Sequence, residues 1–322
     1  MSLINIEYYL SNILNFSLKM KKTYISILVV AFVAFLSVAC NSTAKTTNAT
    51  VTAAKEQKLA NSLLWKISGN GLENPSYLYG TIHMTCNYVL TDKMKKAFEE
   101  TNQLALEIDM DDPEMQTKMM QGMMMTDGKT MKSILSEEDF SELSAFFKDN
   151  TGMNLEMFNT VKPFAVSAML ISKMVPCSPP GSYELEFMKI AKDQNEEVQG
   201  LETIEYQMGV FDSIPYKDQL DELVKMAKEG IEESKHEFTK ITELYTIEDI
   251  EGLLKVMTES EDMTAKFKDE LLDKRNQNWI PVIQKMSKEK PTFFGVGAMH
   301  LPGEEGVIKL LRNAGYTVEA VK

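Results

Sequence analysis

Residues 104–109 have the sequence Leu-Ala-Leu-Glu-Ile-Asp, which is typical of a short buried strand, and helical patterns flank it on both sides. Four further strand patterns lie toward the two ends of the chain, at 63–67, 77–82, 292–296 and 317–321. Residues 202–290 are almost entirely helical in pattern and rich in acidic side chains. Strands combined with helices in this way favour layers of sheet and helix over an all-helical bundle. We therefore predict a mixed α/β (α+β) fold, with a central mixed sheet built from N- and C-terminal strands and a large helical middle layer.

The composition is that of a globular protein. The chain has 322 residues, of which 44% are hydrophobic, and a formal net charge of −13. This acidic balance argues against nucleic-acid binding, which requires clustered Lys and Arg. Only three cysteines are present, which excludes a multi-disulfide scaffold and multi-cysteine zinc ribbons. Histidine is equally scarce, so imidazole chemistry is limited to His83, His300 and His236, and the last lies in a charged helical stretch and is expected at the surface.

The first 39 residues have the layout of an export signal. A basic cluster at 19–22 precedes an apolar run at 23–38, and small residues lead to Cys40. Residues 1–19 fit no such layout, and we expect Met20 to be the true start. A small residue directly before Cys40 resembles the lipobox of bacterial lipoproteins, in which the cysteine is lipidated. An uncleaved signal anchor, or an ordinary signal with a chance cysteine, is the alternative.

The remaining chain is expected to form a tether and one domain. Residues 40–58 are polar and without periodicity, as in a flexible tether, and residues 59–322 are globular in pattern. Acyl chains on Cys40 would hold the domain at a bacterial membrane, facing the periplasm or the cell exterior. The oligomeric state is not indicated.

Two matched motifs carry the candidate chemistry. Gly80 precedes His83 by three residues, Gly297 precedes His300 by three residues, and each motif ends a strand pattern. A glycine there allows close approach of the backbone, and residues at strand ends project into the crevice where open sheets bind ligands. Two neutral imidazoles brought together with a carboxylate form a typical divalent metal site. The competing interpretation is a hydrogen-bonded structural role for each histidine.

Among the many charged residues, those at the ends of predicted strands or in predicted helices with a distinctive neighbour are the other candidates for the functional site. Glu107 ends the strand at 104–108 and is a candidate metal ligand or general base, or a helix N-cap. Glu184 opens a helix after a Pro-Pro-Gly break. Arg275 and Asn276 lie in the helical stretch 271–283, where Arg275 is either a group that polarises a carbonyl or an exposed helix residue.

Two cysteines flank the predicted pocket. Cys86 lies three residues after His83, and Cys177 lies shortly before Glu184. Outside the cytosol a pair of this kind is most simply a disulfide. A thiolate metal ligand or two free buried thiols are the alternatives.

The ordered set of motifs resembles the TraB/GumN family, which includes TIKI-type metalloproteases. The resemblance covers about residues 63–322 and ends in a specific tail. Its markers are Tyr79-Gly80-Thr81-Ile82-His83, Leu106-Glu107-Ile108-Asp109, Gly200-Leu201-Glu202-Thr203 with Gln207, Arg275-Asn276 with Trp279, and Val296-Gly297-Ala298-Met299-His300-Leu301-Pro302-Gly303.

The resemblance implies a fold with two related halves, akin to erythromycin esterase-like and haem-binding ChaN-like proteins. It also implies a cleft built from both Gly-x-x-His motifs and a peptidase that depends on Mn²⁺ or Co²⁺. His83 and His300 match the paired motifs, Glu107 the acidic position, and Arg275 with Asn276 the basic-amide position. Many relatives have Gly-x-Asp where this chain has Ser182-Tyr183-Glu184, which leaves the role of Glu184 open.

The leading hypothesis is a lipid-anchored, metal-dependent hydrolase that cleaves a peptide or protein substrate. His83, His300 and Glu107 would hold the metal, and Arg275 with Asn276 would stabilise the oxyanion. The alternative is a surface lipoprotein that binds a peptide or haem without turnover.

Overall fold

The structure is a computed structural model that describes residues 58–86, 88–177, 180–260 and 263–322. All of these belong to one compact unit. The predicted signal segment and Cys40 lie outside the described residues, so the predictions made for them stay predictions. Within the described residues, no helix is long and apolar enough to span a bilayer.

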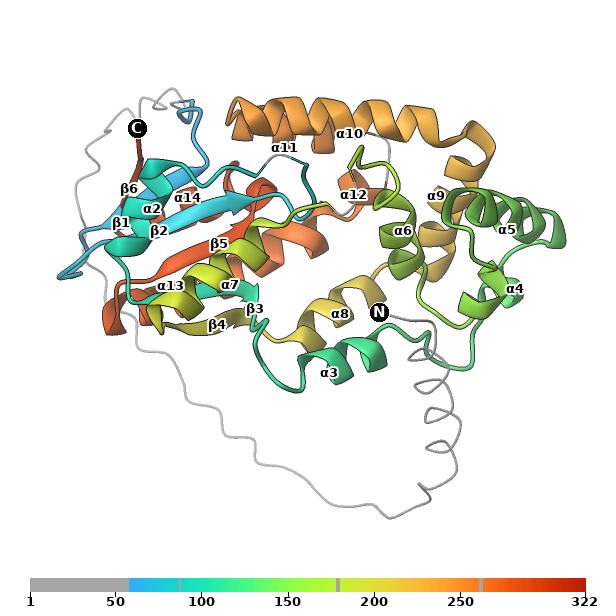
Figure 1. The fold of residues 1–322 in the computed structure, drawn as a ribbon, viewed down its shortest axis with the longest axis horizontal. Coiled ribbons are helices and arrows are strands. Elements are labelled where there is room, and N and C mark those ends of the chain that lie inside the picture. Colours follow the sequence, from blue (N-terminus) through green and yellow to red (C-terminus); the bar gives the residue numbers. More distant parts are fainter. Residues whose placement is uncertain (1–57, 87, 178–179, 261–262) are drawn as a thin grey trace, which may run out of the picture. The chain divides into compact units, whose positions relative to one another are not determined.

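A six-stranded mixed sheet forms the centre of the fold (Figure 1), as predicted. Its order is β4 (Glu197–Glu202), β3 (Gln103–Ile108), β5 (Phe293–Gly297), β2 (Ser76–Thr81), β1 (Leu64–Ser68) and β6 (Thr317–Ala320). The first four strands are mutually parallel, and β1 pairs antiparallel with both β2 and β6. Segments from both ends of the chain therefore meet in one sheet, and the carboxyl ends of four strands share one edge.

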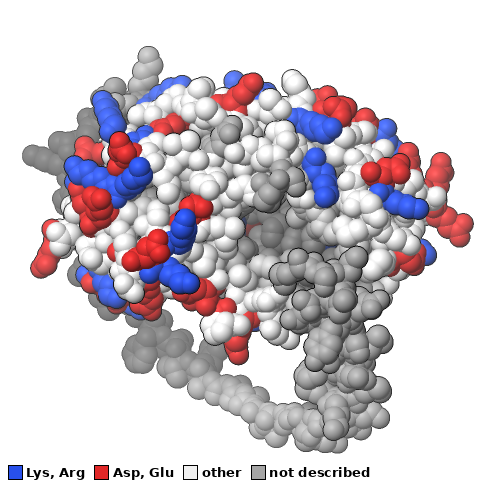
Figure 2. Space-filling model, viewed as in Figure 1, with Lys and Arg blue, Asp and Glu red and all other residues white. Residues whose placement is uncertain are grey.

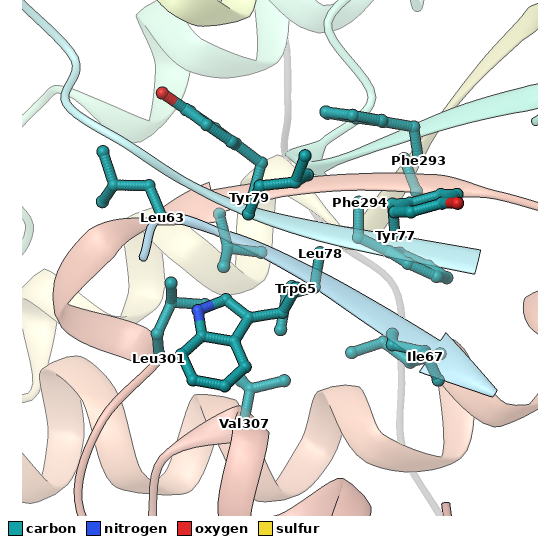
Figure 3. Close-up of a cluster of buried hydrophobic side chains, with 14 of the residues drawn as sticks. Leu63, Trp65, Ile67, Tyr77, Leu78, Tyr79, Phe293, Phe294, Leu301 and Val307 are labelled. Carbon is teal, nitrogen blue, oxygen red and sulfur yellow. The ribbon is translucent and has the colours of Figure 1, made fainter. Parts of the chain in front are cut away.

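Helices cover both faces of the sheet. Helices α2 (Asp92–Glu99) and α7 (Tyr183–Gln194) pack on one face, where Phe98 stacks on Phe293 with ring centroids 3.8 Å apart. Helices α13 (Lys274–Glu289) and α14 (Val307–Asn313) cover the other face. Figure 3 shows Trp65 and Val307 on the side of the strands opposite to Tyr79. The result is a three-layered α/β/α unit with apolar packing above and below the sheet.

The middle of the chain builds a second hydrophobic core that is wholly helical. It is formed by α4 (Met131–Ile134), α5 (Glu137–Thr151), η1 (Leu155–Phe158), α6 (Pro163–Ile171) and α9 (Tyr216–Glu229). The Ser136 hydroxyl caps α5 by accepting from the Asp139 amide at 3.0 Å, and Pro163 occupies the first turn of α6. A serine at the N-cap and a proline in the first turn are both favoured, so the local sequence explains where these two helices begin.

Five further helices and two short helical turns complete the described part of the chain. These are α3 (Met115–Gly122), α8 (Ile204–Asp212), α10 (Ile231–Thr246), α11 (Ile250–Glu259), α12 (Met263–Lys266), the π-helical turn η2 (Asp269–Asp273) and the short η3 (Ala298–His300). His236 is exposed on α10, as expected. On the face shown in Figure 2, the described acidic and basic side chains are interspersed, without a continuous basic patch.

Candidate functional site

The parallel strands deliver the candidate residues to one edge of the sheet. His83 follows β2, Glu107 lies in β3, and His300 follows β5, and these three strands are neighbours. His83, Glu107, His300 and Arg275 line one pocket of about 230 Å³. A second pocket of about 210 Å³ shares His83 and Glu107 with it. The two Gly-x-x-His motifs therefore do meet at a crevice, at the carboxyl ends where open parallel sheets bind ligands.

Close packing around the backbone explains why both motifs have glycine at their first position. A Cβ on Gly80 would lie 2.9 Å from the Cα of Ala298, so β2 could not pass so close to the segment after β5. The Gly297 amide donates to Glu107 Oε1 at 2.8 Å. A Cβ on Gly297 would lie 3.3 Å from that same oxygen and 3.5 Å from the His300 ring. The glycines thus allow the strand ends and the two histidines to converge.

His83 forms an ion pair with Glu184. The His83 Nδ1 lies 3.0 Å from Glu184 Oε1, and that oxygen also accepts from the Thr81 hydroxyl at 2.7 Å. The second carboxylate oxygen accepts from the Ser182 hydroxyl at 2.5 Å. The His83 side chain is 69% exposed, whereas that of Glu184 is only 11% exposed.

This pairing determines the protonation of both groups. The hydrogen bond to Glu184 raises the pKa of His83 above its usual 6.5. Burial raises the pKa of Glu184, but its hydrogen bond to His83 outweighs this and the pKa is lowered overall. With its pKa raised to about 9, His83 is an imidazolium near neutral pH, and the lone pair of Nε2 becomes free to accept a proton only as the pH rises toward that value.

Arg275 lies at the centre of a buried ionic network. Its Nη2 donates to Glu107 Oε2 at 2.6 Å and to Glu202 Oε1 at 2.7 Å. Trp279 donates from its indole nitrogen to the other oxygen of Glu202 at 2.8 Å. Burial raises the pKa of Glu107, but the nearby Arg275 charge outweighs it and lowers the pKa to about 2. Glu107 is therefore a permanently ionised carboxylate near neutral pH.

His300 is buried and neutral. Its Nδ1 lies 2.6 Å from Asn276 Oδ1, and its Nε2 lies 3.2 Å from Arg275 Nη1. Because Asn276 donates its own amide to the Glu305 carbonyl at 2.7 Å, its oxygen faces His300. This arrangement puts the imidazole proton on Nδ1 and leaves Nε2 to accept from Arg275. Burial is the main cause that lowers the pKa of His300 to about 3.

A π-helical turn presents Arg275 to the site. In η2 the backbone hydrogen bonding is shifted, and the Leu271 carbonyl accepts from Arg275 Nη1 at 3.0 Å. The Nε group donates to Glu202 at 3.0 Å. With the bonds to Glu107 and His300, all five guanidinium N–H groups have an acceptor among the described residues. Such turns are frequent at functional sites.

Two links tie the loop after His83 to the loop before Glu184. Cys86 and Cys177 form a disulfide, which confirms that prediction. Thr85 and Gly181 exchange backbone hydrogen bonds of 3.0 and 2.7 Å. The distance between His83 and Glu184 is therefore set by covalent and backbone constraints, in addition to their own hydrogen bond.

The predicted metal ligands do not assemble into a metal site. Among the described residues, no group of three or more His, Cys, Asp and Glu is arranged to hold an ion. Both nitrogens of His300 and both oxygens of Glu107 already have partners. A metal bound through His300 Nε2 and Glu107 Oε2 would have to lie where the Arg275 guanidinium lies.

Sequence reasoning assigned no role to several residues of the site. Glu202, Gln207 and Trp279 were recognised only as parts of family motifs. Gln207 donates to Glu107 Oε2 at 3.0 Å, and Glu202 is the principal partner of Arg275. Thr81, which supports Glu184, lies within the first Gly-x-x-His motif and was also missed.

Comparison with known proteins gives a family and distant relatives. The sequence model of the TraB/PrgY/gumN family matches residues 63–320. "Metalloprotease TIKI1" from Danio rerio is 23% identical over 318 residues, which cover 80% of this chain and 63% of the relative. "Metalloprotease TIKI2" from Xenopus tropicalis is 23% identical over 325 residues, which cover 82% of this chain and 61% of the relative. The chain thus spans less than two thirds of the length of these relatives. No solved structure matches the chain.

Proposed function

Because the chain belongs to the TraB/PrgY/gumN family, and relatives of it are named metalloproteases, we propose that it is a hydrolase that cleaves peptide bonds at the carboxyl edge of its sheet. The observation that carries this proposal is the pair of His83 and Glu184 at the pocket that both Gly-x-x-His motifs form. An exposed imidazole with a buried carboxylate behind it is the arrangement of a general base.

In the proposed reaction, the neutral form of His83, whose fraction grows as the pH rises toward the raised pKa, takes a proton on Nε2 from the attacking water. Glu184 holds Nδ1–H, fixes the tautomer and stabilises the imidazolium that forms. The water oxygen bonds to the scissile carbonyl carbon, and the imidazolium then returns the proton to the departing amine. Atoms and charge balance with one water consumed for each bond cleaved.

The buried network positions these groups and takes no part in proton transfer. A carboxyl with a pKa of about 2 is a poor base near neutral pH, so the role of general base does not suit Glu107. Arg275 has every N–H engaged within the protein, and Asn276 is engaged by His300 and Glu305. We therefore assign Arg275 and Asn276 to positioning in place of oxyanion stabilisation.

The relatives' name implies a divalent metal, for which Mn²⁺ or Co²⁺ is the prediction from the family resemblance. The arrangement of His83, His300 and Glu107 does not fit a shared ion, since the Arg275 guanidinium already engages His300 Nε2 and Glu107 Oε2, and Glu107 Oε1 accepts from the Gly297 amide. No step of the proposed reaction is therefore routed through a metal.

The wall of the first pocket supports a preference among substrates. Ile241, Leu253, Leu272 and Met299 line it beside His83. Burial of an apolar side chain against such a wall contributes about 0.8 kcal/mol for each CH₂ group. We propose a peptide or protein substrate with a large aliphatic side chain next to the scissile bond.

The proposed location is outside the cytosol, at a membrane surface held by lipidated Cys40. The signal-like segment before Cys40 supports this, and so does the disulfide between Cys86 and Cys177, since such bonds persist in oxidising compartments.

A peptide library with mass-spectrometric detection tests the function. The wild-type chain should cleave a subset of peptides rich in aliphatic residues, and His83→Ala should reduce cleavage by at least about 100-fold. His236→Ala is the matched control, since this histidine is exposed on α10. Equal cleavage by wild type and His83→Ala would refute the proposal, and so would binding of peptides without turnover.

A further inference from the structure

The geometry points to Arg275 as the built-in cation of this site: its guanidinium occupies the position of a metal ion and prevents a divalent ion from binding through His300 and Glu107. This inference rests on the contacts of the described residues and does not depend on which reaction the site performs. It predicts a property of the chain that runs against the name of its relatives.

The donors that converge on Arg275 are those of a metal site. Glu107 Oε2 lies 2.6 Å from Nη2, Glu202 Oε1 lies 2.7 Å from Nη2, and His300 Nε2 lies 3.2 Å from Nη1. Two carboxylates and a neutral imidazole are a common ligand set for divalent ions. Here their lone pairs are directed at a guanidinium instead.

Even the orientation of His300 is that of a ligand histidine. A histidine that binds metal donates its other ring N–H to a fixed acceptor, which sets the tautomer. His300 donates from Nδ1 to Asn276 Oδ1 at 2.6 Å, and Asn276 is anchored on the Glu305 carbonyl. The lone pair of Nε2 therefore has one fixed direction, and Arg275 lies in it.

Arg275 cannot easily leave this position. Its side chain is 9% exposed, and Nη1 also donates to the Leu271 carbonyl in the π-helical turn. The guanidinium lies 4.9 Å from the centre of the Trp279 ring, and its Nε donates to Glu202. A swing of the side chain would leave Glu202 and Glu107 as buried carboxylates without a counter-charge, which is strongly unfavourable.

A divalent ion cannot share the site with the guanidinium. An ion bound to His300 Nε2 or Glu107 Oε2 would lie next to Nη1 or Nη2, in a buried region where like charges repel strongly. Arg275 already compensates one of the two carboxylate charges that a metal would neutralise. The presence of two Gly-x-x-His motifs therefore does not make this chain a metal binder.

Metal titration of purified protein tests the inference, with Mn²⁺ and Co²⁺ alone as probes and calorimetry as the readout. The variants are wild type, His300→Ala, Arg275→Lys, Arg275→Ala and Arg275→Ala/His300→Ala, each checked for folding by circular dichroism. Wild type and His300→Ala should bind the ions equally weakly. Arg275→Lys should resemble wild type because an ammonium group also supplies the cation. Arg275→Ala should bind at least about 10-fold more tightly, and the double variant should lose that gain.

Two results would overturn the inference. One is a wild-type chain that binds about one ion and loses affinity 10-fold or more on His300→Ala. The other is a folded Arg275→Ala variant that binds no more tightly than wild type. If Arg275→Ala does not fold, the comparison of wild type with His300→Ala still decides, because metal binding by wild type that depends on His300 contradicts the exclusion.

Discussion

Replacing Glu184 by Gln should lower the pKa of His83 by about one unit. The charge on Glu184 lies 3.0 Å from Nδ1 of His83 and favours the imidazolium. At this separation the attraction between unit charges is roughly 1.4 kcal/mol at the dielectric constant of water, and about four times larger at an effective dielectric constant of 20. The His83 ring is mostly exposed, which places the pair near the lower value, and 1.4 kcal/mol corresponds to about one pKa unit.

Proton NMR of the imidazole C2–H signals measures this shift directly, since the chain has only three histidines. His236→Ala assigns one signal. His300, with a pKa lowered to about 3 by burial, should not titrate between about pH 5 and 9. His83 should titrate with a pKa of about 9 in wild type and about one unit lower in Glu184→Gln.

The direction of the His83 pKa shift also determines how the stability of the fold depends on pH. Because the folded pKa of His83 is raised, the stabilisation by Glu184 is complete below the unfolded pKa and is lost as the pH rises through the folded value. If the pKa of His83 changes by less than about 0.3 units in Glu184→Gln, or rises, the assignment of Glu184 as the group that tunes the base is wrong.

Three further predictions concern stability. Arg275→Ala should lower the free energy of unfolding by about 3–5 kcal/mol in urea denaturation, because it leaves two buried carboxylates without their counter-charge. A loss below about 1 kcal/mol would contradict the buried ionic network. Glu107, with a folded pKa of about 2, contributes stability above its unfolded pKa. As the pH falls from about 4.5 to 2, on the order of 3 kcal/mol of the free energy of unfolding should be lost. Thermal unfolding measured against pH should show this loss, and Glu107→Gln should reduce the pH dependence in that range. Joint replacement of Cys86 and Cys177 by Ser should cost about 2–4 kcal/mol through loss of the cross-link, whereas an unchanged denaturation midpoint would show that the disulfide does not constrain the chain.

Much of the sheet could be predicted because its strands are short apolar runs between turns. The patterns at 63–67 and 77–82 correspond to β1 (Leu64–Ser68) and β2 (Ser76–Thr81) within one residue at each end. Residues 304–313 have a helical pattern in the sequence, but helix α14 begins only at Val307. Gly303 has a positive φ of 93°, so the residues after it form a turn before the helix starts.

The location of the site was more predictable than its contacts. A strand end can be recognised locally, and the structure brings the ends of both Gly-x-x-His motifs to one edge of the sheet. The partners of Arg275 depend on tertiary packing. Glu202 and Glu107 are 73 and 168 residues away in the sequence, and no local pattern relates them to the helix that carries Arg275. The same motifs therefore suggested a metal where the structure has a guanidinium.

Cleavage by a metal-free preparation most directly tests whether His83 and Glu184 perform the reaction without a bound ion. The purified chain would be treated with a chelator, its metal content checked by elemental analysis, and its activity measured on a peptide selected from the library. We predict that the metal-free chain cleaves at the untreated rate and that His83→Ala does not cleave. Loss of activity on chelation, restored by Mn²⁺ or Co²⁺ and dependent on His300, would contradict both the proposed reaction and the role of Arg275.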